Sequence, residues 1–332
     1  MQASQDWREL LGGIIQDPHE RQRLAKTLGV NPITLTRWVN QEADPRPQSL
    51  HKLLHALPEY REVFLELFQE EGQDLSAVIA DDLQGHELNT ISAEFYARVL
   101  RTRATLPKSL CFSSLCDLIL QQALKHLDPY RAGMAIIVVR CLPPLHGDKI
   151  RSLRESLGRG TPPWGNSLEQ QAILLGAESI AGHAVTKGYI IVNQNLKESQ
   201  SQFVGYRGEW EESAAAAPIA LEGNIAGCLL VSSIRPGYFL PSRLALIQSY
   251  ADLIALACES QDFYEPARIE LGLLPPQEVQ WVYLSRFRQR VVETMTQATR
   301  NRQPITVLQA EQFVWQQIEE ELLHLSFFKK EE

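Results

Sequence analysis

The sequence lacks the features that mark secreted, membrane-spanning and zinc-binding chains. Its five cysteines, among 332 residues, form neither an even set nor a Cys-x-x-Cys pair. We therefore expect reduced, buried thiols rather than disulfides or metal ligands. No apolar run reaches the roughly eighteen residues of a membrane helix, and the polar start MQASQDWREL is unlike a signal peptide. These absences predict a cytoplasmic protein without membrane contact.

The common signatures of catalysis are also missing. The sequence contains no GxxxxGK[ST] phosphate loop, no HExxH motif, no GxSxG nucleophile elbow and no kinase motif set. Gly158 and Gly160 flank an arginine but lack the third glycine of a dinucleotide fingerprint. His183, within IAGHAVTKG, is more simply a surface or packing histidine than a general base. We predict that the protein is not an enzyme and has no metal site, and the sequence leaves the identity of any cofactor open.

Negative charge is abundant, but it is concentrated in one segment. The net charge is −8, and between Glu59 and Asn89 nine acidic residues stand against Arg61 alone. From Pro18 to Leu57 six basic residues stand against three acidic ones. Because a partner phosphate responds to the local field, the acidic total does not exclude DNA binding through the N-terminal segment.

The stretch RLAKTLGVNPITLTRW, from Arg23 to Trp38, predicts two short helices that meet at one glycine. Gly29 can end the first helix in a left-handed cap. Asn31 then offers a side-chain oxygen as the N-cap of the second helix, and Pro32 sits where a missing N–H costs nothing. The side chains of the second helix that we expect to face inward are Leu35, Trp38 and Val39.

The same segment carries residue pairs at the spacing of a known DNA-binding motif. These are Leu24-Ala25, Leu28-Gly29-Val30, Thr34-Leu35, Arg37-Trp38 and Arg46-Pro47. From about Trp7 to about Leu57 the chain thus resembles the helix-turn-helix of the phage-repressor-like, or XRE, family. The resemblance implies that the helix from Asn31 to Asn40 enters the major groove of double-stranded DNA. The implied DNA contacts are Arg21, Gln22, Asn31, Ile33, Thr34, Thr36, Arg37, Asn40 and Arg46.

The segment departs from that family at two places. Pro32 and Ile33 stand where relatives often have glutamine or serine, and the loop QEADPRP carries Glu42 and Asp44 where small or basic residues are usual. The alternative interpretation is a helix-turn-helix that has kept its fold and binds proteins. A solvated surface role for Arg37 stays open as well.

The middle of the chain predicts an antiparallel sheet flanked by helices. MAIIVVRCL, from Met134 to Leu142, is a β-branched run of the buried-strand type. AAAAPIALEGNIAGCLLVSS predicts two strands around the turn Glu222-Gly223-Asn224, and a helix follows Pro241. A long amphipathic helix ends before Asp128 and precedes the first strand.

This order of elements carries a second resemblance. The matching residues are Ile180-Ala181-Gly182 to Gly188, Ala217-Pro218-Ile219, Gly223 to Gly227, Leu229 to Ser233, and Arg235-Pro236 through Phe239 to Leu246. Over roughly Leu110 to Cys258 the chain resembles a GAF domain, which implies a ligand cup over one face of the sheet. The ligand contacts that we expect there are Trp164, Tyr189, Asn193, Phe203, Tyr206, Arg207 and Trp210. They would suit a planar, anionic small molecule. Alternatively, these aromatic residues fill the pocket and the domain only dimerises; a thiol sensor built on Cys111 and Cys116 is a third interpretation.

Behind the sensor-like region, the sequence predicts two amphipathic helices broken at Gln303-Pro304. Two helices cannot make a sizeable core alone, so we expect them to pack on the sensor or on another subunit. The nearby Arg286, Arg288 and Arg290 are interpreted as a solvated face.

The sequence therefore predicts a multidomain chain with four segments. They are an all-α helix-turn-helix domain over residues 1–71, a helical connector over 72–109, an α+β GAF-like domain over 110–260, and a C-terminal helical hairpin or dimerisation segment over 261–332. We predict a homodimeric, ligand-responsive transcription regulator that binds double-stranded DNA. The alternative function is a protein-interaction scaffold, or signalling adaptor, without DNA binding.

Overall fold

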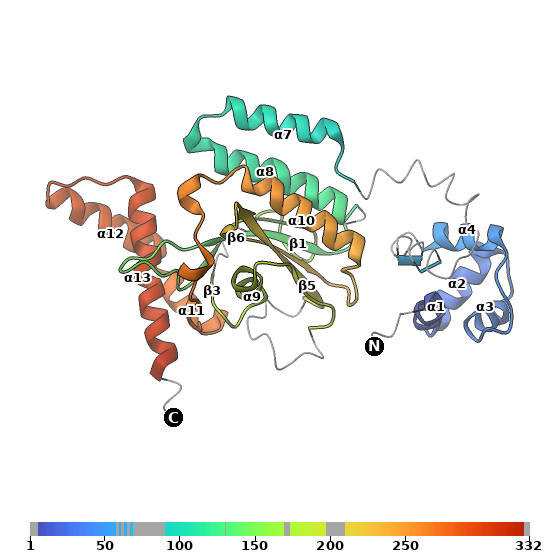
Figure 1. Ribbon diagram of the computed structural model, residues 1–332. Helices are drawn as coiled ribbons and strands as arrows, with labels where there is room; N and C mark the ends of the chain where they lie inside the picture. Colours follow the sequence, from blue (N-terminus) through green and yellow to red (C-terminus); the bar gives the residue numbers. More distant parts are fainter. Residues whose placement is uncertain are drawn as a thin grey trace. The chain divides into compact units, whose positions relative to one another are not determined.

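The chain forms two compact units, Met1–Leu88 and Asn89–Glu332 (Figure 1). The computed structural model describes residues 6–57, 60, 63–64, 67–68, 90–129, 131–168, 173–196 and 210–328. The acidic segment that the sequence places between Glu59 and Asn89 lies mostly outside the described residues.

The first unit is helical. Its regular helices are α1 (Trp7–Ile15), α2 (Pro18–Leu28), α3 (Pro32–Val39) and α4 (Pro47–Ala56). Side chains from all four helices meet in one core, in which Trp7, Leu24, Leu35 and Leu53 are completely buried. Because each helix is short, its stability depends on this shared core more than on helix propensity.

The corner between α2 and α3 has the local geometry that the sequence predicts. Gly29 adopts the left-handed conformation, with φ 71° and ψ 33°, and its N–H bonds to carbonyls of the last turn of α2. The side-chain oxygen of Asn31 accepts from the Ile33 N–H at 3.0 Å, and Pro32 occupies the first helical position. Leu35 and Trp38 are buried, and Val39 is half-buried. These four local predictions are confirmed.

The second unit is built on one antiparallel sheet. Its strands are β1 (Met134–Cys141), β2 (Leu153–Gly160), β3 (Leu174–Leu175), β4 (Ile191–Asn193), β5 (Ser213–Leu221) and β6 (Asn224–Ser233), in the spatial order β3-β2-β1-β6-β5-β4. Glu222 and Gly223, both with positive φ, form the tight turn between β5 and β6, as the sequence predicts for this hairpin. The predicted fold class, a helical region followed by an antiparallel sheet flanked by helices, is confirmed.

Both faces of the sheet are buried. Along β1, Ile136 and Val138 point to one face, and Ile137 and Val139 point to the other. The first face is covered by α8 (Lys108–Leu127) and α10 (Pro241–Ala255), and α7 (Ala93–Thr105) lies outside α8 (Figure 1). The opposite face is covered by α9 (Ile180–Lys187) and by helices from the end of the chain.

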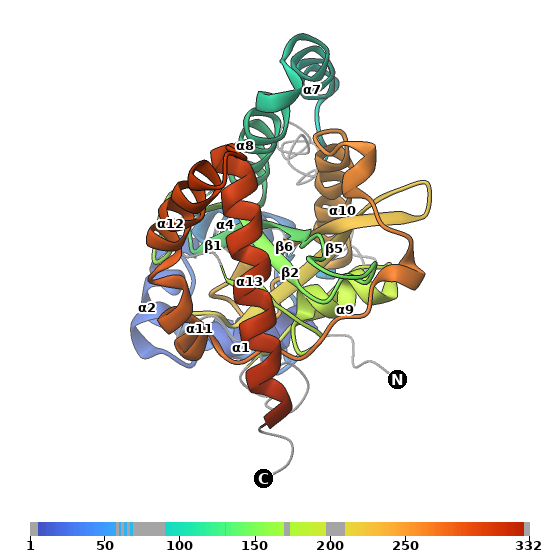
Figure 2. The same ribbon diagram turned by 90° about the vertical axis from the view of Figure 1, so that its left-hand side faces the viewer.

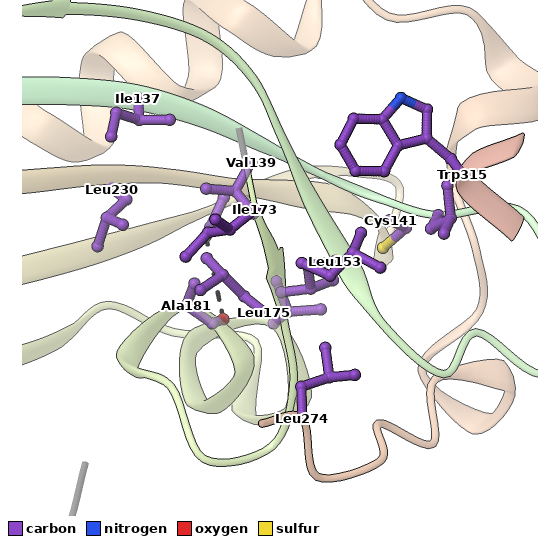
Figure 3. Packing of buried hydrophobic residues seen from close by; sticks show 14 of the residues in the cluster. Ile137, Val139, Cys141, Leu153, Ile173, Leu175, Ala181, Leu230, Leu274 and Trp315 are labelled. Atoms are coloured by element: carbon purple, nitrogen blue, oxygen red, sulfur yellow. Dashed lines mark hydrogen bonds between the residues drawn. The ribbon is translucent and has the colours of Figure 1, made fainter. Parts of the chain in front are cut away.

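The C-terminal segment completes the second face. It consists of two short 3-10 turns, Ser260–Asp262 and Pro266–Arg268, followed by α11 (Gln277–Leu284), α12 (Phe287–Arg300) and α13 (Val307–Phe328). Figure 3 shows Trp315 of α13 beside Cys141, on the sheet face that also carries Ile137 and Val139. Figure 2, viewed from the side, shows α13 crossing in front of the sheet. The expectation that these helices pack on the sensor is confirmed within this unit.

One helix in this segment differs from the prediction. The sequence predicts a single helix before Gln303-Pro304, but the structure interrupts it between Leu284 and Phe287. The interruption contains no proline or glycine, so no local signal marks it. Its cause is tertiary: Gln280 holds α11 to the sheet edge, whereas Phe287 packs against Trp315 in a tilted arrangement, with ring centroids 4.7 Å apart.

Gln280 closes the open edge of β3. Its side-chain oxygen accepts from the Leu174 N–H at 3.0 Å, and its amide nitrogen donates to the Leu174 carbonyl at 2.9 Å. One amide thus replaces the backbone of a missing neighbouring strand. An edge strand otherwise exposes unpaired N–H and C=O groups.

Replacing Gln280 by leucine should therefore destabilise the second unit, because two buried backbone groups of Leu174 lose their partners. We expect the free energy of unfolding to fall by about 2–4 kcal/mol, measured by urea denaturation with tryptophan fluorescence. The control is Gln289→Leu, because Gln289 is exposed and, among the described residues, bonds only the side chain of Glu293. Equal losses in the two variants would contradict the role of Gln280.

Glu319 is a buried acid on the side of α13 that faces the sheet, and only 3% of it is exposed. Burial raises its pKa from 4.5 to about 7, although Ser152 and Arg151 act in the opposite direction. The docked helix therefore favours the protonated carboxyl group.

Glu319 should make the stability of the second unit depend on pH. The folded carboxyl keeps its proton up to about pH 7, whereas the unfolded one releases it near pH 4.5. Stability is consequently lost as the pH rises through this window, by up to about 3 kcal/mol. Glu319→Gln should remove that loss in urea denaturation at pH 5 and pH 8, while Glu293→Gln, on the surface of α12, should retain it. A Glu319→Gln protein with the native pH dependence would rule this out.

Candidate functional site

The outer side of α3 is the candidate DNA-contact surface. Ile33, at its start, is 67% exposed, and Asn31, Arg37 and Asn40 are also exposed. Thr34 and Thr36 are half-buried on the flanks of the same helix. Helix α3 thus buries Leu35 and Trp38 and leaves a side with an apolar tip, an arginine and hydrogen-bonding groups.

The other predicted DNA contacts lie on neighbouring elements. Arg21 is half-buried and Gln22 is exposed, both in the first turns of α2. Arg46 is exposed and immediately precedes α4. The structure therefore leaves six of the nine predicted side chains exposed and three half-buried; their contacts with DNA stay a prediction.

Arg37 has only a weak local partner. Its Nε atom lies 3.7 Å from Glu42 Oε2, and both side chains are more than half exposed. An ion pair of this kind contributes little in water, so it exchanges readily for another anion. The loop after α3 folds back on the helix, because the Glu42 N–H donates to the Arg37 carbonyl at 2.9 Å.

The second acid of this loop has a structural role. Asp44 accepts from Arg8 Nη2 at 2.8 Å, and the Arg8 guanidinium lies 4.6 Å from the centre of the Trp7 ring. This contact ties the loop to α1. The resemblance alone marks Asp44 as an unfavourable charge beside DNA, whereas the structure shows that an arginine of the same unit partly neutralises it.

The structure describes four of the seven predicted ligand residues of the second unit. Trp164 is half-buried and packs on the core under the sheet, and Asn193 is buried, with its oxygen accepting from the Asn195 N–H at 3.0 Å. Tyr189 and Trp210 are 58% and 55% exposed. The remaining three, Phe203, Tyr206 and Arg207, lie outside the described residues. The ligand role of all seven stays a prediction.

The sheet face expected to hold a ligand is occupied in large part by the protein itself. Leu274 and the α13 residues Val314, Trp315 and Ile318 are buried on this side together with α9. Sequence periodicity marks these tail residues as apolar but does not say which surface they cover. Tail side chains thus cover part of this face, and the alternative in which the predicted aromatic residues fill the pocket stays a prediction.

The cysteines are buried and unpaired with one another. Burial raises the pKa of Cys141 and of Cys258 to about 12, and it also raises the pKa of Cys116 and Cys228. A thiol that stays protonated at neutral pH is a poor nucleophile. The burial of Cys111 and Cys116 in the core beneath α7 argues against the thiol-sensor interpretation.

Metal-binding clusters and membrane-spanning helices are both absent from the described residues. Within the described ranges, no three His, Cys, Asp or Glu side chains come together as a metal site would require. None of the helices in the same ranges has the length and apolar character needed to cross a membrane.

Comparison with known proteins identifies the central part of the second unit. The family model described as GAF domain matches residues 112–259. No curated protein matches the sequence. Similar solved structures include the type II free methionine-R-sulfoxide reductase from Thermoplasma acidophilum, which is 20% identical with a TM-score of 0.34. The match covers 48% of this chain and 98% of the reductase chain.

Two more solved structures are similar over the same part of the chain. The GAF domain from Acinetobacter phosphoenolpyruvate-protein phosphotransferase is 13% identical, with TM-score 0.35, covering 50% of this chain and 93% of that one. The GAF-B domain of DevS from Mycobacterium smegmatis is 18% identical, with TM-score 0.28, covering 46% and 92%. From the family match, together with the observed antiparallel sheet between two helical layers, residues 112–259 form a GAF domain.

Proposed function

We propose that the protein is a DNA-binding transcription regulator of the phage-repressor-like helix-turn-helix type. The observation that supports this most is the corner at Gly29, which joins two short helices and leaves Ile33, Arg37 and Asn40 exposed on the second. A helix of this size fits the major groove of B-form DNA. Its exposed side combines the residue types that read base edges and phosphates.

Each exposed side chain has a role that its chemistry suits. The Arg37 guanidinium can donate two hydrogen bonds to one guanine, and Ile33 can contact a thymine methyl group. Asn40 and Arg46 can bind backbone phosphates, which fixes the register of the helix on the duplex. The weak pairing of Arg37 with Glu42 leaves its guanidinium available for this exchange.

In this proposal the GAF domain regulates DNA binding. GAF domains sense small molecules or mediate dimerisation, and a homodimer would present two α3 helices to half-sites about 34 Å apart. A small-molecule effector changes DNA affinity only if it binds two states of the dimer with different affinity. The filled sheet face favours dimerisation as the domain's main contribution.

Replacing Arg37 by alanine should weaken DNA binding without unfolding the protein, since the side chain is exposed and its one ion pair is weak. We expect a loss of roughly 5–150-fold on the bound sequence, which corresponds to 1–3 kcal/mol. The measurement is an electrophoretic shift, at two salt concentrations, with DNA from upstream of the protein's own gene and a random duplex of equal length. Arg98→Ala, an exposed arginine of the second unit, is the matched control.

Steep loss of retention with salt would support DNA binding, and an unequal effect of Arg37→Ala on the two duplexes would support base reading. If neither duplex is retained at either salt concentration by a folded protein, the regulator proposal fails. Recovery of a stable protein partner through the first unit would then favour the scaffold.

A further inference from the structure

The outer side of α7 is an exposed apolar seam. Phe95 and Val99 point inward and are buried against α8. Both views of the unit show α7 as the outermost helix on this side of the sheet (Figures 1 and 2). The seam on its outer side consists of Ala93, Ala97, Leu100 and Ala104, all exposed.

The spacing of the seam is that of a helix-pairing surface. Its residues follow one another at intervals of four, three and four, as the a and d positions of a coiled coil do. Leu100, at its centre, is 57% exposed, although a solitary surface helix gains nothing from such a pattern. The alanines allow a second helix to approach closely, to an axis separation of about 8 Å.

Two charges beside the seam indicate the occupant. Glu94 and Arg101 lie seven residues apart on the same flank, and neither has an ion-pair partner among the described residues. An antiparallel copy of α7 places Glu94 of each subunit opposite Arg101 of the partner subunit. The same arrangement packs Leu100 of each subunit against Ala97 of the partner subunit. A parallel copy instead leaves both Glu94 carboxylates without a cation.

We propose that two copies of this chain associate through α7, with the two helices antiparallel and joined by two reciprocal Glu94–Arg101 ion pairs. This inference rests on the homodimer of the proposed function and specifies its interface. A seam of four positions per helix is short compared with a standard interface of about 1,600 Å². The dimer is consequently expected to form in a concentration-dependent manner.

Charge reversal in the full-length protein tests the pairing. Sedimentation velocity over a series of concentrations should give a monomer–dimer equilibrium for the native chain. Glu94→Arg and Arg101→Glu should each raise the dimer dissociation constant at least several-fold, since each places like charges opposite one another. The double variant Glu94→Arg/Arg101→Glu should restore association. Arg98→Glu, exposed on the same helix but outside the seam, should leave it unchanged.

Cross-linking tests the direction of the helices. In the antiparallel pair the two Ala97 positions lie close to the two-fold axis, whereas the two Ala93 positions are separated by about 16 Å along the helix axis. A short bismaleimide should therefore join two subunits of Ala97→Cys and spare Ala93→Cys. The five native cysteines are buried, so the unmodified chain should not cross-link and measures the background.

A native chain that stays monomeric throughout the concentration series would overturn the proposal. So would a dimer that is indifferent to both charge reversals, or one that cross-links through Ala93→Cys. Each of these outcomes is independent of DNA retention, so failure of the α7 interface and failure of DNA binding are distinguishable.

Discussion

The second unit depends on one constraint: the central strands β1 and β6 are apolar on both sides, so both faces of the sheet must be covered. Val139 and Leu230 point to one face, and Val138 and Leu229 point to the other. Helices α8 and α10 cover the face that carries Val138 and Leu229. The face that carries Val139 and Leu230 is only partly covered by α9, a helix of eight residues. The C-terminal helices are therefore part of the core: Trp315 of α13 lies beside Cys141, in the same buried cluster as Val139 and Leu153 (Figure 3).

Polar contacts determine where that covering segment lies. Hydrophobic burial is non-directional, whereas the amide of Gln280 fits only an open strand edge, and Gln316 donates to the Pro143 carbonyl at 2.8 Å. Glu178 adds a third contact, accepting from the N–H groups of Gly176 and Leu274. These bonds fix the register of a tail that apolar packing alone would leave free to slide. They also explain why the tail and the GAF domain form one compact unit.

The sequence predicts the parts of this structure whose signals are local. Gly29, Asn31 and Pro32 specify the α2–α3 corner through backbone geometry and capping alone, and Glu222-Gly223 specifies the β5–β6 turn. The break after Leu284 could not be predicted in this way, because it follows from contacts with residues far away in the chain. The pairing of Asp44 with Arg8 across 36 residues is of the same kind. For the candidate ligand residues, the sequence supplies aromatic side chains in loops but does not determine whether they converge.

Two exposed apolar features among the described residues, Ile33 of α3 and the seam of α7, differ in what they indicate about function. A single exposed apolar side chain, such as Ile33, is common in soluble proteins and says little alone. Ile33 supports DNA binding because Arg37 and Asn40 are exposed on the same short helix. On α7 the exposed apolar residues are informative because they recur at a regular helical interval, as Ala97 and Leu100 do. Residues of opposite charge, Glu94 and Arg101, lie beside them. In both cases the pattern of neighbours, rather than the exposure itself, identifies the kind of molecule that the surface can bind.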